Sequence, residues 1–138
     1  MLYEDDVTDA VCVELERRGW MIVQKLRATQ KGDDIVAVRG TERLVVEAKG
    51  ETSSKPTTGR YGSAFDSGQV NSHVSRAMLR AMRVVSEGCQ AAVAFPNEEL
   101  HRLEIETVRI AIGRLGVAVC WVSPDCSVEI DQTADFEV

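Results

Sequence analysis

The sequence lacks any apolar run close to the roughly 18 residues that a membrane-spanning helix requires. Its first residues are acidic rather than basic, which is not typical of a secretory signal peptide. Cys12, Cys89, Cys120 and Cys126 show no C-x-x-C spacing, so a zinc site is not indicated and the cysteines are expected to be reduced. We therefore expect a cytoplasmic protein that makes no contact with a membrane.

Three common signatures of small-molecule enzymes are also absent: a glycine-rich phosphate loop, a serine nucleophile elbow and a paired histidine motif. A small-molecule enzyme on an α/β fold therefore stays only as a minor alternative. The 138 residues are long enough for one domain with its own hydrophobic core.

A broad basic surface is missing as well. The formal net charge is −6, whereas nucleic-acid-binding proteins gain most of their non-specific affinity from Lys and Arg. Part of the acidity lies in residues 5–9 and 124–138. Between Lys55 and Arg83, five basic residues stand against one acid, a local balance of +4. The charge distribution thus leaves room for nucleic-acid contact in this segment.

Hydrophobic periodicity predicts alternating helices and strands. Apolar residues at helical spacing predict a helix over 5–18, closed by Gly19, and a second helix over 67–87. Asn97 is expected to cap a third helix that runs to about residue 115. The expected strands cover residues 20–28, 33–39, 43–50, 91–95 and 117–122, and a loop rich in Ser, Thr and Gly covers residues 51–66.

The predicted order of elements is αβββαβαβ. It describes an antiparallel meander followed by helical crossovers to strands whose continuous apolar runs indicate burial on both faces. The fold class predicted is α/β, with a mixed central sheet flanked by helices. The expected domain covers residues 1–123, and residues 124–138, which contain acids but no Lys or Arg, are expected to form an acidic C-terminal tail.

Two neighbouring strands carry the most informative motif, GDDIVAV followed by VVEAKG. Glu47 and Lys49 are two positions apart, so their side chains project from the same face of a strand. If residues 33–39 and 43–49 form a hairpin, Asp34 at the start of the first strand lies beside the end of the second. Two carboxylates and one ammonium group then converge. The alternative is a solvated strand face with a Glu–Lys pair.

These residue types suit a hard divalent cation. Mg²⁺ usually takes one or two carboxylates and keeps water or phosphate oxygens in its other positions, and Asp34 and Glu47 match that donor set. The cation lowers the pKa of a bound water molecule and neutralises charge on a phosphate, while Lys49 can orient the attacking water. We therefore expect a metal-dependent site that uses Mg²⁺, with Mn²⁺ as a substitute.

At these residues the chain resembles the PD-(D/E)xK nuclease superfamily, whose core carries an Asp followed by Glu-x-Lys on the next strand. Asp33 stands where the motif often has Pro. The resemblance extends over residues 4–122 and implies a restriction-endonuclease-like core. The stretches VEAKGETSS, YGSAFDSGQV and HVSRAMLRA also resemble a group of small stand-alone restriction-endonuclease-like proteins from microbes, a likeness that implies no particular substrate.

The first predicted helix offers a third carboxylate. Glu4 and Glu14 both lie on its apolar side, about 15 Å apart along the axis. Because the chain turns back at Gly19, the strand over 20–28 returns toward the start of the helix, where Asp34 begins the next strand. Glu4 is therefore preferred as a metal ligand. The alternative for Glu4 is an N-terminal acid stabilised by the helix dipole.

On the second predicted helix, polar and mostly basic side chains recur at steps of four and three. They are Gln69, His73, Arg76, Arg80 and Arg83. The superfamily resemblance implies that Gln69, at the start of this helix, assists at the active site. A basic stripe of this kind can follow a phosphate backbone, and the residues predicted to do so are Lys55, Arg60, His73, Arg76 and Arg80. An ordinary solvated helix face is the alternative.

Together these features predict a Mg²⁺-dependent nuclease that hydrolyses DNA phosphodiester bonds. Asp34, Glu47, Lys49 and Gln69 are the predicted catalytic residues, with Glu4, Asp34 and Glu47 as metal ligands. A homodimer is expected if the enzyme cuts both strands, whereas a nicking or branch-specific enzyme, such as a Holliday-junction resolvase, can act as a monomer. The alternative from another class is a module on the same fold that binds nucleic acid or protein without cutting.

Overall fold

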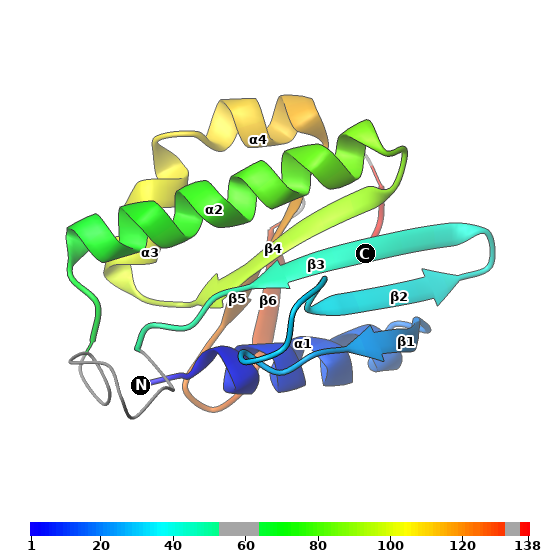
Figure 1. Cartoon of the computed structure of the whole chain (residues 1–138), viewed down its shortest axis with the longest axis horizontal. Helices are drawn as coiled ribbons and strands as arrows, with labels where there is room; N and C mark the ends of the chain where they lie inside the picture. Colours follow the sequence, from blue (N-terminus) through cyan, green and yellow to red (C-terminus); the bar gives the residue numbers. More distant parts are fainter. Residues whose placement is uncertain (53–63, 132–135) are drawn as a thin grey trace.

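A mixed β-sheet of six strands forms the centre of the molecule, with helices on both of its faces (Figure 1). The computed structural model describes residues 1–52, 64–131 and 136–138. The helices are α1 (Glu4–Arg17), α2 (Ser67–Ser86), α3 (Glu99–Glu106) and α4 (Arg109–Leu115). The strands are β1 (Met21–Lys25), β2 (Ile35–Arg39), β3 (Glu42–Ala48), β4 (Gln90–Pro96), β5 (Ala118–Val122) and β6 (Val128–Asp131). This arrangement confirms the predicted fold class, an α/β fold with a mixed central sheet flanked by helices.

The six strands lie side by side in the order in which they occur along the chain. β1, β2 and β3 form the predicted antiparallel meander. β4 is parallel to β3, and β5 is parallel to β4, because α2 and the α3–α4 pair return the chain to the same end of the sheet. β6 then runs antiparallel to β5 and forms the far edge.

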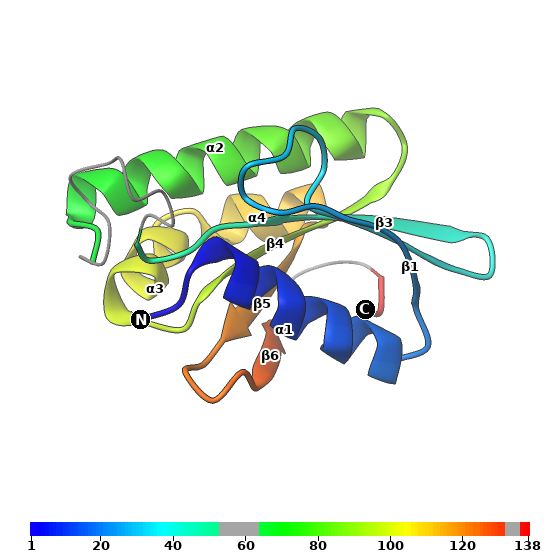
Figure 2. The same ribbon diagram turned by 60° about the horizontal axis from the view of Figure 1, so that its bottom comes forward.

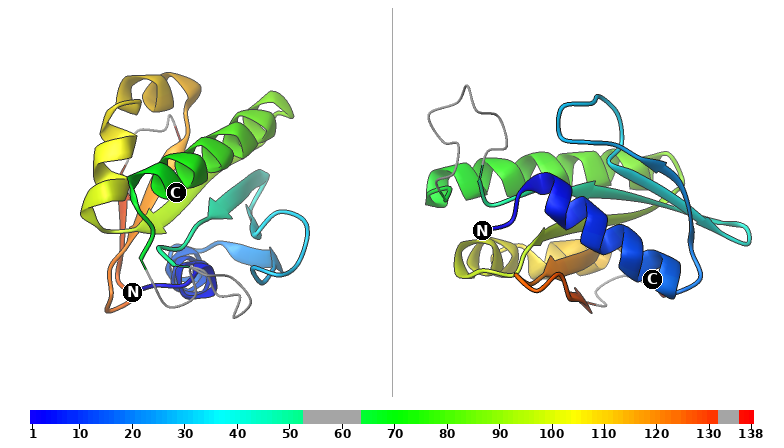
Figure 3. Two further views of the ribbon diagram at one scale, coloured as in Figure 1. Left: turned by 60° about the vertical axis from the view of Figure 1, so that its left-hand side comes forward. Right: turned by 90° about the horizontal axis from the view of Figure 1, so that it is seen from below.

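The sheet is buried on both faces. On one face, Val7, Val11 and Leu15 of α1 pack against alternating residues of the central strands. The other face is covered by α2, α3 and α4 (Figures 2 and 3). β4 and β5 lie between these layers, which explains their continuous apolar sequences. Within the described ranges, no helix has both the length and the apolar character needed to cross a bilayer.

The hairpin between β2 and β3 brings the motif residues together. Arg39 is opposite Glu42, so Gly40 and Thr41 form a two-residue turn, and Gly40 adopts the positive φ of 61° that such turns require. At the other end of the hairpin, Ile35 is opposite Val46. Asp34 directly precedes β2, and Glu47 follows Val46 on β3, so the hairpin brings the two acids to the same end of the sheet.

The third predicted helix is in fact two helices. The first begins after Glu98, not Asn97, because the Glu98 carboxylate accepts the backbone N–H groups of Leu100 and His101. The helix stops at Thr107, whose hydroxyl donates to the carbonyl of Glu104 at 2.6 Å and so competes with the helical hydrogen bonding of the next turn. The single helix expected over residues 97–115 is therefore wrong in its start and in its continuity.

Residues 124–138 are not simply an acidic tail. Val128 to Asp131 form β6 against β5, an edge strand that the sequence analysis did not predict. Val128 and Ile130 pack against the α1 side of the core, and Val138 is only 2% exposed within it. The alternating apolar residues were the available signal, but the acids between them obscured the pattern. The four cysteines are all free, as expected for reduced thiols.

Candidate active site

The residues of the motif lie where β3 ends and β2 begins. The Asp34 side chain is mostly buried, at 7% exposure, and its Oδ2 accepts the backbone N–H of Ala48 at 2.8 Å. This hydrogen bond crosses between the two strands just beyond their last paired residues. It fixes the Asp34 carboxylate beside the segment that carries Glu47 and Lys49.

Glu47 and Lys49 form an ion pair at this end of β3, with Nζ 3.5 Å from Oε1. Each side chain is 17% exposed, so the pair is accessible to a small ligand but largely removed from bulk water. The backbone N–H of Lys49 donates to the carbonyl of Ala94 at 3.0 Å, which anchors the residue to β4. Asp34, Glu47 and Lys49 therefore converge, as the spacing in the sequence predicts.

Glu4 approaches the same site through a close backbone contact. A Cβ atom on Gly50 would lie 2.5 Å from the backbone nitrogen of Glu4, so only glycine allows the chain after β3 to pack this tightly on the start of α1. Leu2 and Glu51 reinforce the contact: the N–H of Leu2 donates to Oε1 of Glu51, and the N–H of Glu51 donates to the carbonyl of Leu2.

Glu14 has a different environment. It lies in the last part of α1 and accepts hydrogen bonds from the guanidinium groups of Arg17 and Arg18. Of the two candidate glutamates, the structure therefore places Glu4 at the site, as the helix geometry predicts. Its role as a metal ligand remains a prediction.

Burial is the largest cause of perturbed pKa values among the three acids. It raises the pKa of Glu4 and of Glu47 to about 7 each, and the charge of Asp34 adds to both shifts. Burial also raises the pKa of Asp34, although the hydrogen bond from Ala48 and the charge of Lys49 act in the opposite direction. The fold thus keeps three acids close together although their burial and mutual repulsion both disfavour the ionised forms. The neighbouring charge of Lys49 offsets part of this cost.

The donor set fits a hard divalent cation only in part. Across residues 1–52, 64–131 and 136–138, no three His, Cys, Asp or Glu side chains are arranged so that all could bind one metal ion. Asp34 and Glu47 nevertheless supply the two carboxylates that Mg²⁺ commonly takes from a protein. Glu4 interacts electrostatically with both, but the three do not form a complete set of direct ligands in this conformation.

Gln69 stands in the first turn of α2 and takes part in a capping box with Asp66. The N–H of Gln69 donates to Oδ1 of Asp66 at 2.9 Å, and the N–H of Asp66 donates to Oε1 of Gln69 at 2.8 Å. The amide oxygen of Gln69 therefore stabilises the start of the helix. Catalytic assistance by Gln69 stays a prediction. It would fall to the amide nitrogen, because the amide oxygen already accepts the hydrogen bond from Asp66.

His73 lies one turn further along α2, close enough to the site for the charge of Lys49 to act on it. Burial lowers its pKa to about 4, and Lys49 is the largest charged contributor to the same shift. The ring packs on Phe65 with centroids 4.6 Å apart, and its Nδ1 is buried with no hydrogen-bond partner among the residues that the structure describes. His73 is thus a neutral imidazole near Lys49, a different state from the phosphate-binding cation implied by a basic stripe.

The remaining residues of the predicted stripe have different surroundings. Arg80 pairs with Asp33, its Nε donating to Oδ1 at 2.7 Å, so its guanidinium serves an internal contact. Arg76 is exposed and is available to a phosphate group. Lys55 and Arg60 lie outside the described residues. The sequence did not reveal that Asp33 is the partner of Arg80, because it offers no means of distinguishing the role of Asp33 from that of the adjacent Asp34.

A second buried histidine, His101, was also missed. It is fully buried on α3, and its Nδ1 pairs with the Glu98 carboxylate. The Glu98 and His101 spacing of three residues on a helix start was the available signal.

Comparisons with known proteins add little to this picture. No model of a protein family matches the chain, and no curated protein matches it. Among solved structures, the chain is similar to SfsA of Pyrococcus furiosus, determined in complex with Ca²⁺, at 13% identity and a TM-score of 0.42. The match covers 98% of this chain and 62% of that one, so the chain spans less than two thirds of the length of SfsA. A likeness this distant carries no argument about function.

Proposed function

We propose that this chain is a divalent-metal-dependent nuclease of the PD-(D/E)xK type that hydrolyses DNA phosphodiester bonds. The observation that carries the proposal is the convergence of Asp34, Glu47 and Lys49 at the end of β3, with both carboxylates protonated more readily than usual. Clustered acids with raised pKa values are costly to a fold, and such clusters are enriched at catalytic sites.

Each residue has a distinct part in the proposed reaction. Asp34 and Glu47 would hold Mg²⁺ or Mn²⁺, and the cation would supply an activated water molecule and neutralise charge on the phosphate. The Lys49 ammonium, already 3.5 Å from Glu47, orients the attacking water and stabilises negative charge that develops on the phosphoryl oxygens. Glu4, whose charge interacts with Asp34 and Glu47, would supply the third carboxylate, either on the metal or on a water molecule bound to it.

His73 contributes as an uncharged group. Because burial and Lys49 keep its pKa at about 4, the imidazole does not add a second positive charge beside Lys49 at neutral pH. A neutral ring can still donate or accept one hydrogen bond to the substrate or to water. We therefore assign His73 a positioning role, and Arg76 on the exposed side of α2 the role of a phosphate contact.

The test is incubation of the purified chain with linear, nicked, branched and single-stranded DNA in Mg²⁺, in Mn²⁺ and in chelator. We expect cleavage that requires the cation and falls by at least about 100-fold in Lys49→Ala and Glu47→Gln. Arg43→Ala and Glu42→Gln are matched controls, since they remove a cation and an acid from the opposite end of the same strand. Cleavage that persists in chelator or in Lys49→Ala would exclude the proposal.

A module that binds a protein partner or nucleic acid without cutting is the second candidate, and the charge distribution favours the protein partner. The net charge is −6, and several cations outside the site are already neutralised by ion pairs, among them Lys25, Arg27 and Arg102. Such a module would leave all four DNA substrates uncut in either cation, and tight binding of one of them without cleavage would indicate its nucleic-acid-binding form. A preference for branched over linear DNA in the same assay would instead indicate a resolvase-like nuclease.

A further inference from the structure

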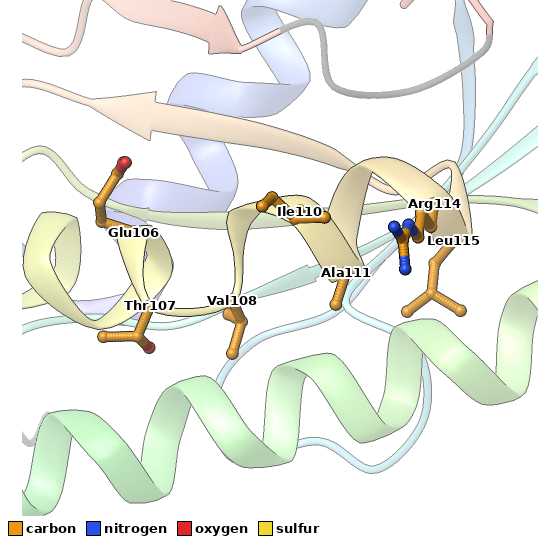
Figure 4. A pocket seen from close by; sticks show the side chains of 7 residues that line it. All are labelled: Glu106, Thr107, Val108, Ile110, Ala111, Arg114 and Leu115. Carbon is orange, nitrogen blue, oxygen red and sulfur yellow. The ribbon is translucent and has the colours of Figure 1, made fainter.

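The α3–α4 segment exposes apolar side chains on the outside of the molecule. Ile110 is 75% exposed and Leu103 is 58% exposed, both high values for large aliphatic side chains. A hollow of about 570 Å³ has Ile110 in its wall and is lined by residues between 106 and 115 (Figure 4). Its apolar lining includes Val108, Ala111 and Leu115, which point toward α2.

α2 adds a further apolar side chain on this side. The amide of Asn71 donates to Glu104 of α3 at 2.6 Å, which identifies the face of α2 that is turned toward α3. At about 100° per residue, Met82 lies roughly 20° from Asn71 around the helix and therefore shares that face. Met82 is 40% exposed. Met82 does not line the hollow itself, so it extends the exposed apolar surface next to it.

Opposite charges flank Ile110 at equal spacing. Glu106, Ile110 and Arg114 follow one another at steps of four residues along the outer side of the segment (Figure 4). Within the described parts of the chain, Arg114 has no hydrogen-bond or ion-pair partner. Glu106 has only a 3.8 Å contact with Arg109, whose guanidinium is also held by Asp131 at 2.7 Å. The row therefore presents an acid, an apolar side chain and a base to an incoming surface.

We propose that a second copy of this chain binds here about a two-fold axis that passes near Ile110. In a two-fold interface, if one residue contacts a second residue of the other copy, the second residue of the first copy makes the same contact in return. An antiparallel approach of two α3–α4 segments therefore brings Glu106 against Arg114 of the partner subunit, twice. The same approach places Ile110 of each copy in the hollow of the other.

The surface itself favours a second copy over other occupants. A projecting apolar side chain and a hollow lie next to each other on one face, which is the condition for self-complementarity. The acid and the base of the row cancel, so a polyanion such as DNA gains nothing here. The inference is independent of the proposed nuclease function, because it uses none of the residues at the end of β3.

The test of the surface is sedimentation velocity over a concentration series that reaches about 100 µM, where an interface of modest affinity is populated. We expect a dimer in the unaltered protein and a monomer in Ile110→Glu. Val13→Glu is the matched control: Val13 is 68% exposed on α1, on the other face of the sheet, and its substitution should leave the dimer intact. Circular dichroism melting checks that both variants fold.

The test of the two-fold geometry is a charge exchange. Glu106→Arg alone and Arg114→Glu alone each place two like-charged pairs in the dimer and should weaken it by about ten-fold. The double variant restores opposite charges and should recover the original affinity. A monomeric unaltered protein, a dimer that survives Ile110→Glu, an assembly larger than a dimer, or a double variant no tighter than the singles would each overturn the proposal.

Discussion

Arg80 donates from Nε to Oδ1 of Asp33 at 2.7 Å, which ties the middle of α2 to the residue that precedes Asp34. The two side chains are 31% and 23% exposed, so the pair is shielded from much of the solvent. The loop between β1 and β2 is thereby fixed on the same side of the sheet as α2 (Figure 2). The position of Asp34 depends on this contact as well as on the hairpin.

The first prediction concerns this ion pair. Arg80→Ala should lower the free energy of unfolding by about 1 kcal/mol, because a half-buried charge pair is worth slightly more than a fully exposed one. Asp33→Ala should cost a similar amount. The double variant should cost little more than either single, since both remove the same interaction. Denaturant unfolding of the four proteins measures all three differences.

Arg76→Ala is the control for Arg80→Ala, because Arg76 is exposed one turn earlier on the same helix. It should leave the free energy of unfolding unchanged within about 0.5 kcal/mol and weaken only DNA binding. Strictly additive effects of Asp33→Ala and Arg80→Ala would show that the pair contributes nothing.

The second prediction concerns pH. Glu4 and Glu47 have folded-state pKa values raised to about 7 from an ordinary 4.5, so the folded state binds their protons more tightly than the unfolded chain does. Their stabilising contribution is complete below pH 4.5 and is lost as pH rises through 7. The metal-free protein should therefore lose on the order of 1 kcal/mol between pH 5 and pH 8 from these groups, after solvent screening.

Thermal melting in chelator between pH 5 and pH 8 measures this loss, and Glu47→Gln should reduce it. Mg²⁺ should raise the melting temperature more at pH 8 than at pH 5, because only ionised carboxylates bind the metal. Equal stabilisation by Mg²⁺ at both pH values would contradict binding at these acids. Glu42→Gln is the control, since Arg39 lowers the pKa of Glu42 and its titration lies below this window.

The fold could be predicted because its elements carry strong local signals. The apolar stripes of α1 and α2, the hairpin around Gly40 and the continuous apolar runs of β4 and β5 each have one structural interpretation. The break between α3 and α4 could not be predicted, because the apolar spacing continues across Thr107 and Val108, where the backbone leaves the helical conformation and the Thr107 hydroxyl bonds to the carbonyl of Glu104. β6 was missed because its pairing with β5 is a tertiary contact and its own sequence is short and acidic.

The site was predictable in its centre and not in its surroundings. Strand periodicity and hairpin register are sufficient to bring Asp34, Glu47 and Lys49 together. The neutral state of His73 follows from its packing on Phe65 and its burial beside α3, neither of which the helical spacing reveals. The engagement of Arg80 likewise depends on where a loop far away in the sequence is held.

The third prediction concerns Gly50. An added Cβ would meet the backbone of Glu4, Tyr3 and Leu2 at 2.5, 2.8 and 3.0 Å, and backbone atoms cannot move aside as a side-chain end can. Gly50→Ala should therefore cost about 2–3 kcal/mol, in the range of an overpacked core position. It should also displace Glu4 and so return the pKa of Glu47 part of the way toward its ordinary value, since fewer acids would surround it.

Chemical denaturation measures the cost, and Gly68→Ala serves as the control. Gly68 lies in the first turn of α2, where a new Cβ would come no closer than 3.5 Å to Oδ1 of Asp66. Replacing a helical glycine of this kind should be neutral or stabilise the protein by up to about 1 kcal/mol. A Gly50→Ala protein as stable as the original would show that the chain after β3 does not need this close approach.

The fourth prediction concerns His73. With a pKa of about 4, His73 should stay neutral from pH 5 to pH 8, so its ring resonances should not titrate in that range by nuclear magnetic resonance. Lys49→Met should raise the pKa of His73, because a neighbouring positive charge is removed. The pKa should still remain below 6.5, because burial is the larger cause. Titration of His73 near pH 6.5 in the unaltered protein would show that the ring is solvated.

The fifth prediction concerns the C-terminus. Val138 is 2% exposed within the core on the α1 side, and Nη2 of Arg39 donates to the carbonyl of Glu137 at 2.6 Å. Val138→Ala should cost about 1–2 kcal/mol, and deletion of residues 136–138 should cost more because the hydrogen bond to Arg39 is lost as well. Val13→Ala on the exposed side of α1 is the control and should change stability by less than about 0.5 kcal/mol. If deletion leaves the unfolding midpoint where it was, these residues are a solvated tail and their packing on the sheet contributes no stability.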